Sequence, residues 1–512
     1  MALGFLFAFL CSPASLVLGD VRLPSIIGDK MVLQQDCDAR IWGWADPGEK
    51  VDVTPGWGGN GASTVANEKG KWLVEIRTPK AGGPHTLAVK GKNTIEVKNV
   101  LVGEVWLCSG QSNMTWQMYF FGNYVLGGAE DIKQSTNEKI RYFNVGGKVS
   151  AELQEDVRGA WVECNPETSP KFSAAAFYFG RKVQAETGYP VGLIHSSIGG
   201  TAAQGWTRSE FIENNDGFSS IIENYNKGLK EWEQAVAEAE KHNQKRKPRP
   251  AYPARNVDKA GVLFNGWIRP ITDMTIKGVI WYQGESNTRA AYTYRELFPA
   301  LIKNWRCDFR NFDMPFYFVQ LANFTEGGKP DEVKPYRGEP REHEWAELRE
   351  AQFMANQLKN TGMAVTIDIG SSHNIHPANK RDCGERLALW ALAKDYGKDV
   401  IYSGPLYAGY ATEEGQIRVY FDHAESGLVF RDGRAKGFAI AGKDRKFVWA
   451  NARIEGDTVV VSSEKVKDPV GVRYGWDIDP EVSLYNKAGL PTWPFRTDDW
   501  NGLFFGKLLP KR

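Results

Sequence analysis

The sequence has few of the residues on which metal sites and disulfide frameworks are usually built. Six of its 512 residues are Cys and seven are His, and no two Cys form a CxxC pair. Five Cys remain after the first twenty residues, scattered and odd in number. Paired CxxC motifs are typical of zinc sites, and patterned Cys are typical of disulfide-bonded domains. We therefore infer neither, and interpret the Cys residues as small buried side chains.

The chain also lacks an excess of charge of either sign. Its 63 Lys and Arg residues balance 62 Asp and Glu residues, which leaves a net charge of +1. Nucleic-acid-binding proteins usually carry a basic excess, so we expect no nucleic-acid partner. Aromatic residues, in contrast, are plentiful, with 18 Trp and 19 Tyr. Aromatic faces suit sugar binding, but they also fill the cores of β-sandwiches.

Long apolar runs are missing everywhere except at the start of the chain, which reads MALGFLFAFLCSPASLVLGD. We interpret residues 1–19 as a signal peptide, because the run is short, interrupted, and ends in small residues, although it lacks the usual Lys or Arg near its start. The alternative is a membrane anchor. We therefore expect a secreted or periplasmic/lumenal protein with no membrane contact once the signal is removed.

The length exceeds what one hydrophobic core usually serves, so several domains are expected. Residues 20–100 consist of short alternating runs between turn signals, which predicts an N-terminal β-sandwich region. Residues 400–512 return to strand-like patterns and predict a C-terminal β region. Between them, residues 101–399 are predicted to form a different unit, interrupted by polar insertions at about 224–255 and 324–345.

Residues 101–399 alternate between apolar strands and amphipathic helices. Helical patterns cover 172–188, 290–305, 345–358 and 379–397. Continuous apolar strands separated by such helices predict an α/β fold, a parallel sheet with helices on both faces. The candidate strands are VGEVWLCS (102–109), IRYFNV (140–145), VGLIHSS (191–197), IKGVIWYQ (276–283), MPFYFVQLA (314–322) and MAVTIDIG (363–370).

Small and polar residues follow four of these strands, where ligands bind in open α/β sheets. They are SGQSN (109–113), IGGT (198–201), GESN (284–287) and SSHNIHP (371–377). One edge of the sheet thus collects a serine, two Gly-rich turns, an amide and two histidines. A nucleophile, a base and oxyanion donors are the groups that acyl transfer requires.

The chemistry of these side chains suggests a role for each. Ser112 is the candidate nucleophile, and it needs a base within hydrogen-bond reach. His376 is the candidate base, because imidazole titrates near neutral pH. The backbone of Gly200 and the side chain of Asn287 can donate to an oxyanion, and the backbone N–H of Ser112 is a third candidate donor.

Each feature also has a plain structural interpretation. A serine after a glycine usually forms a turn, His376 can simply begin a helix, and Gly199-Gly200 can be a loop hinge. Glu285 can be a helix-start charge rather than a catalytic acid. The His373-x-x-His376 spacing suits a metal, but no third ligand is evident nearby. The presence of all four loops at one sheet edge favours the catalytic interpretation.

The order GQSN, GGT, QGESN, IHP resembles the SGNH hydrolases, named for Ser, Gly, Asn and His. The longer blocks VWLCSGQSNM, SSIGGTAAQGW, VIWYQGESN and IHPANKRDCGERLA are similar to the sialate O-acetylesterase family. The resemblance covers nearly the whole chain after the signal. It implies Ser112 as nucleophile, His376 as base, Gly200 and Asn287 as oxyanion donors, an acetyl-enzyme intermediate, and no cofactor.

One position departs from the family pattern. Many SGNH enzymes place an Asp three residues before the His, and here that residue is His373. Either a Ser–His dyad operates, with a carbonyl or amide orienting His376, or a more distant carboxylate does so. Glu285 and Asp368 are the candidate carboxylates. An imidazole without an orienting partner loses catalytic power.

The substrate expected from the resemblance is an acetylated sugar or glycan. Sialic acid carries a carboxylate, and Arg208 and Arg289 lie near the motif loops. Similar bacterial esterases act on acetylated xylan or xyloglucan, and sugar-stacking candidates near the motifs are Trp116, Trp206 and Trp281. Two other hypotheses remain open at this point: a glycan-binding module without turnover, and a metal-dependent hydrolase that uses both histidines.

Overall fold

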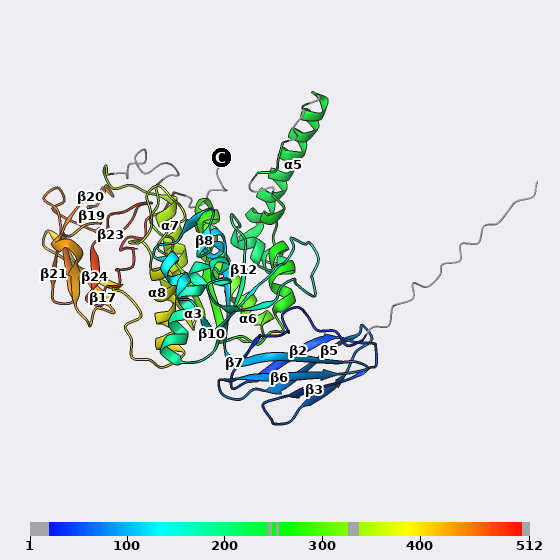
Figure 1. Cartoon of the computed structure of the whole chain (residues 1–512). Coiled ribbons are helices and arrows are strands. Elements are labelled where there is room, and N and C mark those ends of the chain that lie inside the picture. Colours follow the sequence, from blue (N-terminus) through cyan, green and yellow to red (C-terminus); the bar gives the residue numbers. More distant parts are fainter. Residues whose placement is uncertain (1–19, 243, 245–247, 252–254, 326–336, 504–512) are drawn as a thin grey trace, which may run out of the picture.

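The computed structural model describes residues 20–242, 244, 248–251, 255–325 and 337–503. The proposed signal peptide lies outside these ranges. Figure 1 shows a β-region formed by the N-terminal part, a central sheet with helices around it, and a second β-region formed by the C-terminal part. The fold class predicted from the sequence is therefore confirmed.

The N-terminal region forms two layers of short strands. One sheet pairs β2 (Asp38–Trp44) with β5 (Lys71–Arg77). The other joins β3 (Lys50–Pro55), β4 (Ala62–Val65) and β6 (Gly82–Lys90) to the start of β7, and β1 (Val32–Gln34) also pairs with β7. Alternate residues face the core between the layers, as the alternating sequence predicts.

Strand β7 (Thr94–Gly110) runs from this region into the central sheet without a break. Its first residues alternate between exposed and buried, whereas every residue from Val100 to Gly110 is buried. The change follows from the sequence, because a strand covered on both faces needs a continuous apolar run. The boundary that we expected between residues 100 and 101 therefore falls inside one strand.

The central sheet has β7 in its middle. The order is β11-β10-β12-β7-β13-β14-β15, and all neighbours are parallel except β11 at the edge. The chain fills one side of β7 first and then the other, so β7 lies at the point where the order reverses. The other strands are β10 (Asn137–Asn144), β11 (Trp161–Cys164), β12 (Val191–Ser197), β13 (Gly278–Tyr282), β14 (Phe316–Val319) and β15 (Thr361–Ala364).

Helices cover both faces of this sheet. Neighbouring residues of β14 point to opposite faces: Phe316 contacts Phe298 of α6 (Ala291–Asp308), and Tyr317 contacts Trp390 of α8 (Lys380–Lys394). Helix α3 (Ala174–Thr187) packs against α8, and α7 (Glu344–Met354) packs against α6. All four helices lie within three residues of the predicted ranges, except that a short 3₁₀ turn replaces the end of the third.

The sixth strand is shorter than predicted. We expected it at 363–370, but β15 ends at Ala364 and the chain then forms turns. The neighbouring strand β14 ends at Val319, paired with Ala364, so the backbone beyond has no ladder partner. Side chains satisfy part of this backbone instead. The Thr366 hydroxyl donates to the carbonyl of Gln320, and the side-chain oxygen of Asn323 accepts from the Gly370 N–H.

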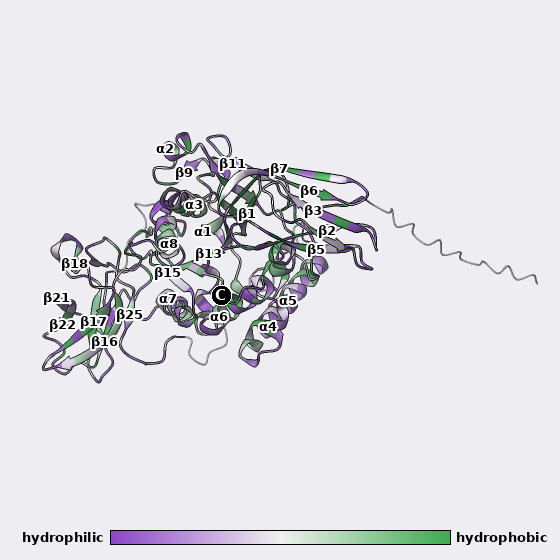
Figure 2. Ribbon diagram, turned by 90° about the horizontal axis from the view of Figure 1, so that it is seen from below, coloured by the Kyte–Doolittle hydropathy of each residue, from purple (hydrophilic) through white to green (hydrophobic). Residues whose placement is uncertain are grey.

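The first insertion contains a helix that projects from the body of the molecule (Figure 1). Helix α5 (Ser219–Lys241) begins five residues before the insertion that we expected at about 224–255. Figure 2 shows hydrophilic and hydrophobic residues alternating along peripheral helices such as α4 (Ser209–Glu213) and α5. Much of the second insertion, residues 326–336, lies outside the described ranges.

The C-terminal region has its own core between two small antiparallel sheets. The core includes Ile417, Val461, Ile440 and Val472. One sheet contains β16 (Leu406–Glu413), β17 (Gln416–Asp422), β22 (Thr458–Ser462) and β21 (Asn451–Glu455). The other contains β20 (Val448–Trp449), β19 (Phe438–Ala441), β23 (Gly471–Tyr474) and β25 (Phe495–Arg496).

A buried arginine joins the C-terminal region to the central unit. Arg349 of α7 is 1% exposed. Its guanidinium donates to the carbonyls of Leu321 and Ala322 after β14, and to those of Asp477 and Ile478 in the C-terminal region. Ala322 also accepts from the Trp345 indole, and Ile478 also accepts from the Phe324 N–H. The carbonyls of Leu321 and Asp477 have no other donor within the described residues, so Arg349 alone satisfies them.

We expect Arg349→Met to lower the free energy of unfolding by at least about 2 kcal/mol, because two carbonyls lose their donor and each orphaned buried acceptor costs roughly 1–3 kcal/mol. The urea midpoint of tryptophan fluorescence measures this change. The control is Lys303→Met on α6, whose side chain is exposed and whose midpoint should not move. Equal midpoints for both variants would contradict the anchoring role of Arg349.

Candidate active site

Three neighbouring strands end at one level, and the candidate residues follow them. Gly110 at the end of β7 is paired with Ser197 of β12 on one side and with Tyr282 of β13 on the other. Ser112 and Gly199 each stand two residues beyond this level, in neighbouring loops. Because β7 is the strand at which the sheet order reverses, this edge is where an open α/β sheet forms its crevice.

The turn after β7 depends on a glycine. Gly110 has φ +140°, and a Cβ on it would lie 2.1 Å from the carbonyl oxygen of Tyr282. Only glycine fits this close approach. The chain then enters the short helix α1 (Ser112–Thr115), which leaves Ser112 partly exposed at the first position.

The Gly-rich loop after β12 lies against the serine. A Cβ on Gly199 would lie 3.4 Å from the Cβ of Ser112. Gly200 has φ +72°, and its carbonyl accepts a hydrogen bond of 2.8 Å from Arg255. This hydrogen bond fixes the orientation of the carbonyl of Gly200. The N–H of Gly200 makes no hydrogen bond within the described residues. The geometry leaves a backbone donor in the loop that lies against Ser112, the kind of group that an oxyanion site requires.

The side chain of Asn287 is fixed by its oxygen. That oxygen accepts from the Ala203 N–H at 3.0 Å and from the Gln283 amide at 2.7 Å. The Asn287 amide nitrogen donates to the oxygen of Gln204 at 3.2 Å. An amide nitrogen carries two hydrogens, so one donor remains. Asn287 is 2% exposed, in the loop after β13.

His376 reaches the same edge from the loop before α8. Its ring stacks on Trp116, with 4.4 Å between ring centroids and 19° between ring planes. Trp116 directly follows α1, and its N–H donates to the carbonyl of Ser112. No hydrogen bond joins Ser112 to His376 within the described part of the chain. Such bonds often form only when substrate is bound.

Asn113 is a site residue that the sequence did not reveal. Its amide nitrogen donates to the carbonyl of Ile375, next to His376, at 3.0 Å, and to Glu285 at 2.5 Å. Its oxygen accepts from the ammonium of Lys380 at 2.5 Å. This buried amide ties the serine turn to the histidine loop and to the loop after β13. Its place directly after Ser112 in the GQSN block was the only signal.

Lys380 is buried and Glu285 and His376 are half-buried around Asn113, and this burial shifts their ionisation. Burial lowers the pKa of His376 to about 4, and the nearby charge of Lys380 contributes to the shift. Burial also lowers the pKa of Lys380 to about 8 and raises the pKa of Glu285. His376 is therefore neutral at physiological pH, which is the form that a general base needs.

Neither proposed carboxylate forms a hydrogen bond or ion pair with His376 in the part of the chain that the structure describes. Asp368 forms a two-point ion pair with Arg386, at 2.6 and 2.8 Å. Glu285 accepts from Asn113, and its second oxygen has no hydrogen-bond partner among the described residues. Two other contacts hold the imidazole. The ring of Trp116 stacks on it, and the backbone N–H of His376 donates to the side chain of Asn374 at 2.9 Å.

The structure separates the other candidates. Trp206 and Trp281 are fully buried core residues, whereas Trp116 is half-buried beside His376. Arg208 forms an ion pair with Asp308 at 3.1 Å, and Arg289 faces Glu344 at 3.9 Å.

The described residues contain no cluster of three or more His, Cys, Asp or Glu arranged to hold a metal ion. Nor does any helix in these ranges have the length and apolar character that crossing a membrane demands.

Comparison with known proteins gives a consistent result. A family model described as carbohydrate esterase, sialic acid-specific acetylesterase, matches residues 102–246 and 257–392. Sialate O-acetylesterase of Mus musculus is 28% identical over 520 residues, covering 93% of this chain and 94% of the mouse protein. The human enzyme of that name is 30% identical over 417 residues, covering 75% of this chain and 73% of its own.

A solved structure is also similar over nearly the whole chain. It is a carbohydrate acetylesterase from Xanthomonas citri, with a TM-score of 0.79 and 35% sequence identity. The match covers 94% of this chain and 100% of the other. The likeness includes both terminal β-regions, so they are shared features rather than peculiarities of this sequence.

We expect Lys380→Gln to raise the pKa of His376 above its value of about 4. A glutamine still donates to Asn113 but removes the positive charge that disfavours imidazolium. Because burial is the larger cause, the pKa should stay below the usual value of about 6.5. NMR titration of His376 measures the shift. Lys394→Gln, at the other end of α8, is the control and should leave it unchanged; an equal shift in both variants would contradict the assignment.

Proposed function

The chain belongs to the sialic acid-specific acetylesterase family of carbohydrate esterases, and we propose that it hydrolyses O-acetyl esters on sialic acid with Ser112 as nucleophile. The family match confirms the resemblance seen in the sequence motifs. It makes the chain an ester hydrolase of carbohydrates. The serine mechanism, the sugar and the cellular location are the parts that we propose.

The proposal rests on one observation, the position of Asn113. This amide contacts the backbone next to His376 while its own neighbour is Ser112. Residues 112 and 376 are far apart in the sequence, so their approach is a product of the fold. Gly199 lies against the same serine, and Asn287 follows the adjacent strand. A nucleophile, a base and donors thus surround one place, as acyl transfer requires.

The reaction proceeds in two stages. Ser112 Oγ attacks the acetyl carbonyl while His376 takes the hydroxyl proton, and the oxyanion is stabilised by the N–H of Gly200 and the amide of Asn287. The N–H of Ser112 is a third donor. His376 then gives the proton to the sugar oxygen that leaves. Water, activated by His376, attacks the acetyl-enzyme and releases acetate from Ser112.

We propose that the enzyme uses a Ser–His dyad. A carboxylate partner usually fixes the tautomer and orientation of the histidine. Within the described residues no carboxylate contacts His376, and Asp368 is held by Arg386. The flat face of Trp116 restricts the imidazole plane instead. Trp116 is therefore a positioning residue for the base.

The surroundings of the site suit a sugar ring. An aromatic hairpin, β8 (Tyr119–Phe120) and β9 (Asn123–Tyr124), begins three residues after Trp116. Phe121 at its tip is 80% exposed, and Phe120 packs edge-on against Trp116. Exposed aromatic faces beside a reaction centre can stack on the apolar face of a pyranose. This hairpin favours a second candidate substrate, acetylated plant polysaccharides such as xylan or xyloglucan.

A sialic acid substrate also needs a cation for its carboxylate. Arg289 lies two residues from Asn287, and its ion pair with Glu344 is long at 3.9 Å. Arg208 is engaged with Asp308, so Arg289 is the better candidate of the two. The relatives named sialate O-acetylesterase support the sialic acid proposal. We further propose that residues 1–19 direct export, which would bring the enzyme to such glycans.

We expect Ser112→Ala to lower kcat for acetate release by at least about 10⁴-fold, because the nucleophile is removed. Acetate is measured with O-acetylated sialic acid and with acetylated xylan fragments, and the better substrate identifies the sugar. Ser63→Ala in the N-terminal region is the control and should keep full activity. Comparable rates for Ser112→Ala and native protein would contradict the serine mechanism.

We expect Trp116→Ala to lower kcat by about 10- to 100-fold, because His376 loses the surface that orients it. Trp116→Phe keeps a flat ring and should restore most of the rate. Phe121→Ala is the matched comparison: it should raise KM for glycans and leave kcat on a small acetyl ester unchanged. A Trp116→Ala enzyme with normal kcat, or no recovery in Trp116→Phe, would contradict the positioning role.

A further inference from the structure

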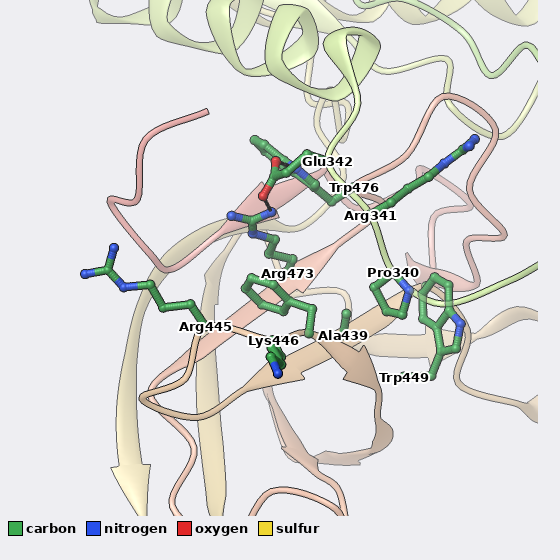
Figure 3. Close-up of a pocket in the computed structure, with 11 residues that line it drawn as sticks. Pro340, Arg341, Glu342, Ala439, Arg445, Lys446, Trp449, Arg473 and Trp476 are labelled. Atoms are coloured by element: carbon green, nitrogen blue, oxygen red, sulfur yellow. Dashed lines mark hydrogen bonds and ion pairs between the residues drawn. The ribbon is translucent and has the colours of Figure 1, made fainter. Parts of the chain in front are cut away.

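A hollow of about 320 Å³ lies in the C-terminal region, away from Ser112 and its partners. Figure 3 shows how its lining residues lie. They come from two places: the segment before α7, with Pro340 and Glu342, and the strands β19, β20 and β23 with their connections. The volume lies at the lower end of the range for ligand pockets, about 300–1,000 Å³.

Trp449 forms one wall of the hollow. Trp449 is 45% exposed, although tryptophan, as a large apolar residue, normally buries most of its surface. The indole N–H donates to the carbonyl of Gly338 at 2.8 Å, which fixes the ring by one edge. In Figure 3 the ring lies beside Pro340. An exposed ring that is held in place costs little conformational entropy when a ligand stacks on it.

A second hollow of about 260 Å³ adjoins the first. Both are lined by Gly437 and Trp449, so the indole stands between them. The second hollow is also lined by Asp479, whose carboxylate accepts a hydrogen bond from Ser372 in the loop that carries His376. Together the two hollows offer room on either side of Trp449 for consecutive rings of a chain.

The charges at the first hollow are mostly positive. Arg341 and Arg473 have carboxylate partners, Asp477 for the former and Glu342 for the latter. Arg445 and Lys446 are exposed, and neither forms an ion pair within the described residues. The Arg445 guanidinium lies over the ring of Trp500, 5.3 Å from its centroid, and extends from the side of the hollow opposite Trp449 (Figure 3). The hollow therefore presents two cations without an ion-pair partner among the described residues, across from an aromatic ring.

We propose that this hollow is a second glycan-binding site, which holds an acidic glycan chain with one sugar ring on Trp449 and the carboxylate of another sugar of the chain near Arg445 and Lys446. The apolar face of a pyranose packs on an indole, and a carboxylate is attracted by the two cations. A protein that acts on carbohydrate would gain affinity for long acidic glycans by holding them at a second place. The inference requires the carbohydrate family but not the Ser112 mechanism.

The test measures binding by calorimetry in the full chain carrying Ser112→Ala. The probe is sialyllactose, a trisaccharide, without O-acetyl groups. Its affinity is compared with that of lactose, the neutral sugar that remains when the sialic acid is removed. We expect Trp449→Ala to weaken binding of the sialylated probe by at least about tenfold. Trp449→Phe keeps a stacking ring and should bind within a few-fold of the parent. Tyr420→Ala, with a side chain similarly exposed at 41%, is the matched control.

The charge is tested in the same way. The double change Arg445→Gln and Lys446→Gln should weaken binding of the sialylated probe, and added salt should reduce the difference from the parent. Lys465→Gln, an exposed lysine outside the hollow, is the control. In native background, Trp449→Ala should hydrolyse a small acetyl ester normally, which separates this site from the reaction centre.

Three results would overturn the proposal. The first is binding of the sialylated probe that is unchanged by Trp449→Ala. The second is equal affinity for the sialylated and the neutral sugar, which would exclude an acid-selective site. The third is no binding of either sugar to the parent chain. If Ser112→Ala retained esterase activity, the serine mechanism would fail while these binding measurements would still decide the second site.

Discussion

The geometry of the reaction centre depends on one buried amide. Asn113 is 2% exposed, and a buried amide must find partners for both its oxygen and its nitrogen. It finds them in three separate parts of the chain: Lys380, Glu285 and the carbonyl of Ile375. Because these hydrogen bonds converge on one side chain, they hold the serine turn and the histidine loop in one relative position.

The second constraint is strand β7. It is continuous from the N-terminal sandwich into the middle of the central sheet, so the sandwich is joined directly to the strand that ends two residues before Ser112. Its neighbours β12 and β13 end at the same level, which brings Gly199 and Asn287 to the serine from either side. The N-terminal region therefore contributes to the site by fixing the position of β7, although no residue of this region belongs to the candidate site.

The sequence predicted the features that depend on local pattern. Apolar strands and amphipathic helices predicted the sheet, and the loops after the strands identified Ser112, Gly200, Asn287 and His376, which the fold brings to one edge. What it did not predict depends on tertiary contacts. Lys380 stands in the first turn of a helix, where a cation is unfavourable. Its hydrogen bond to the buried amide of Asn113 explains why a lysine stands there, and Asn113 is distant in the sequence.

The charges around His376 bear on how the proposed base would work. In the proposed mechanism, an imidazole that takes the Ser112 proton becomes a cation near Lys380, and no carboxylate within the described residues forms a hydrogen bond or ion pair with it. Its pKa of about 4 makes this imidazolium a stronger acid than a free one, which favours proton transfer to the leaving sugar oxygen but disfavours proton uptake from the serine. The negative charge of the oxyanion would form at the same moment and offset the imidazolium charge. The buried ammonium therefore keeps the resting imidazole neutral and also makes it a weaker base.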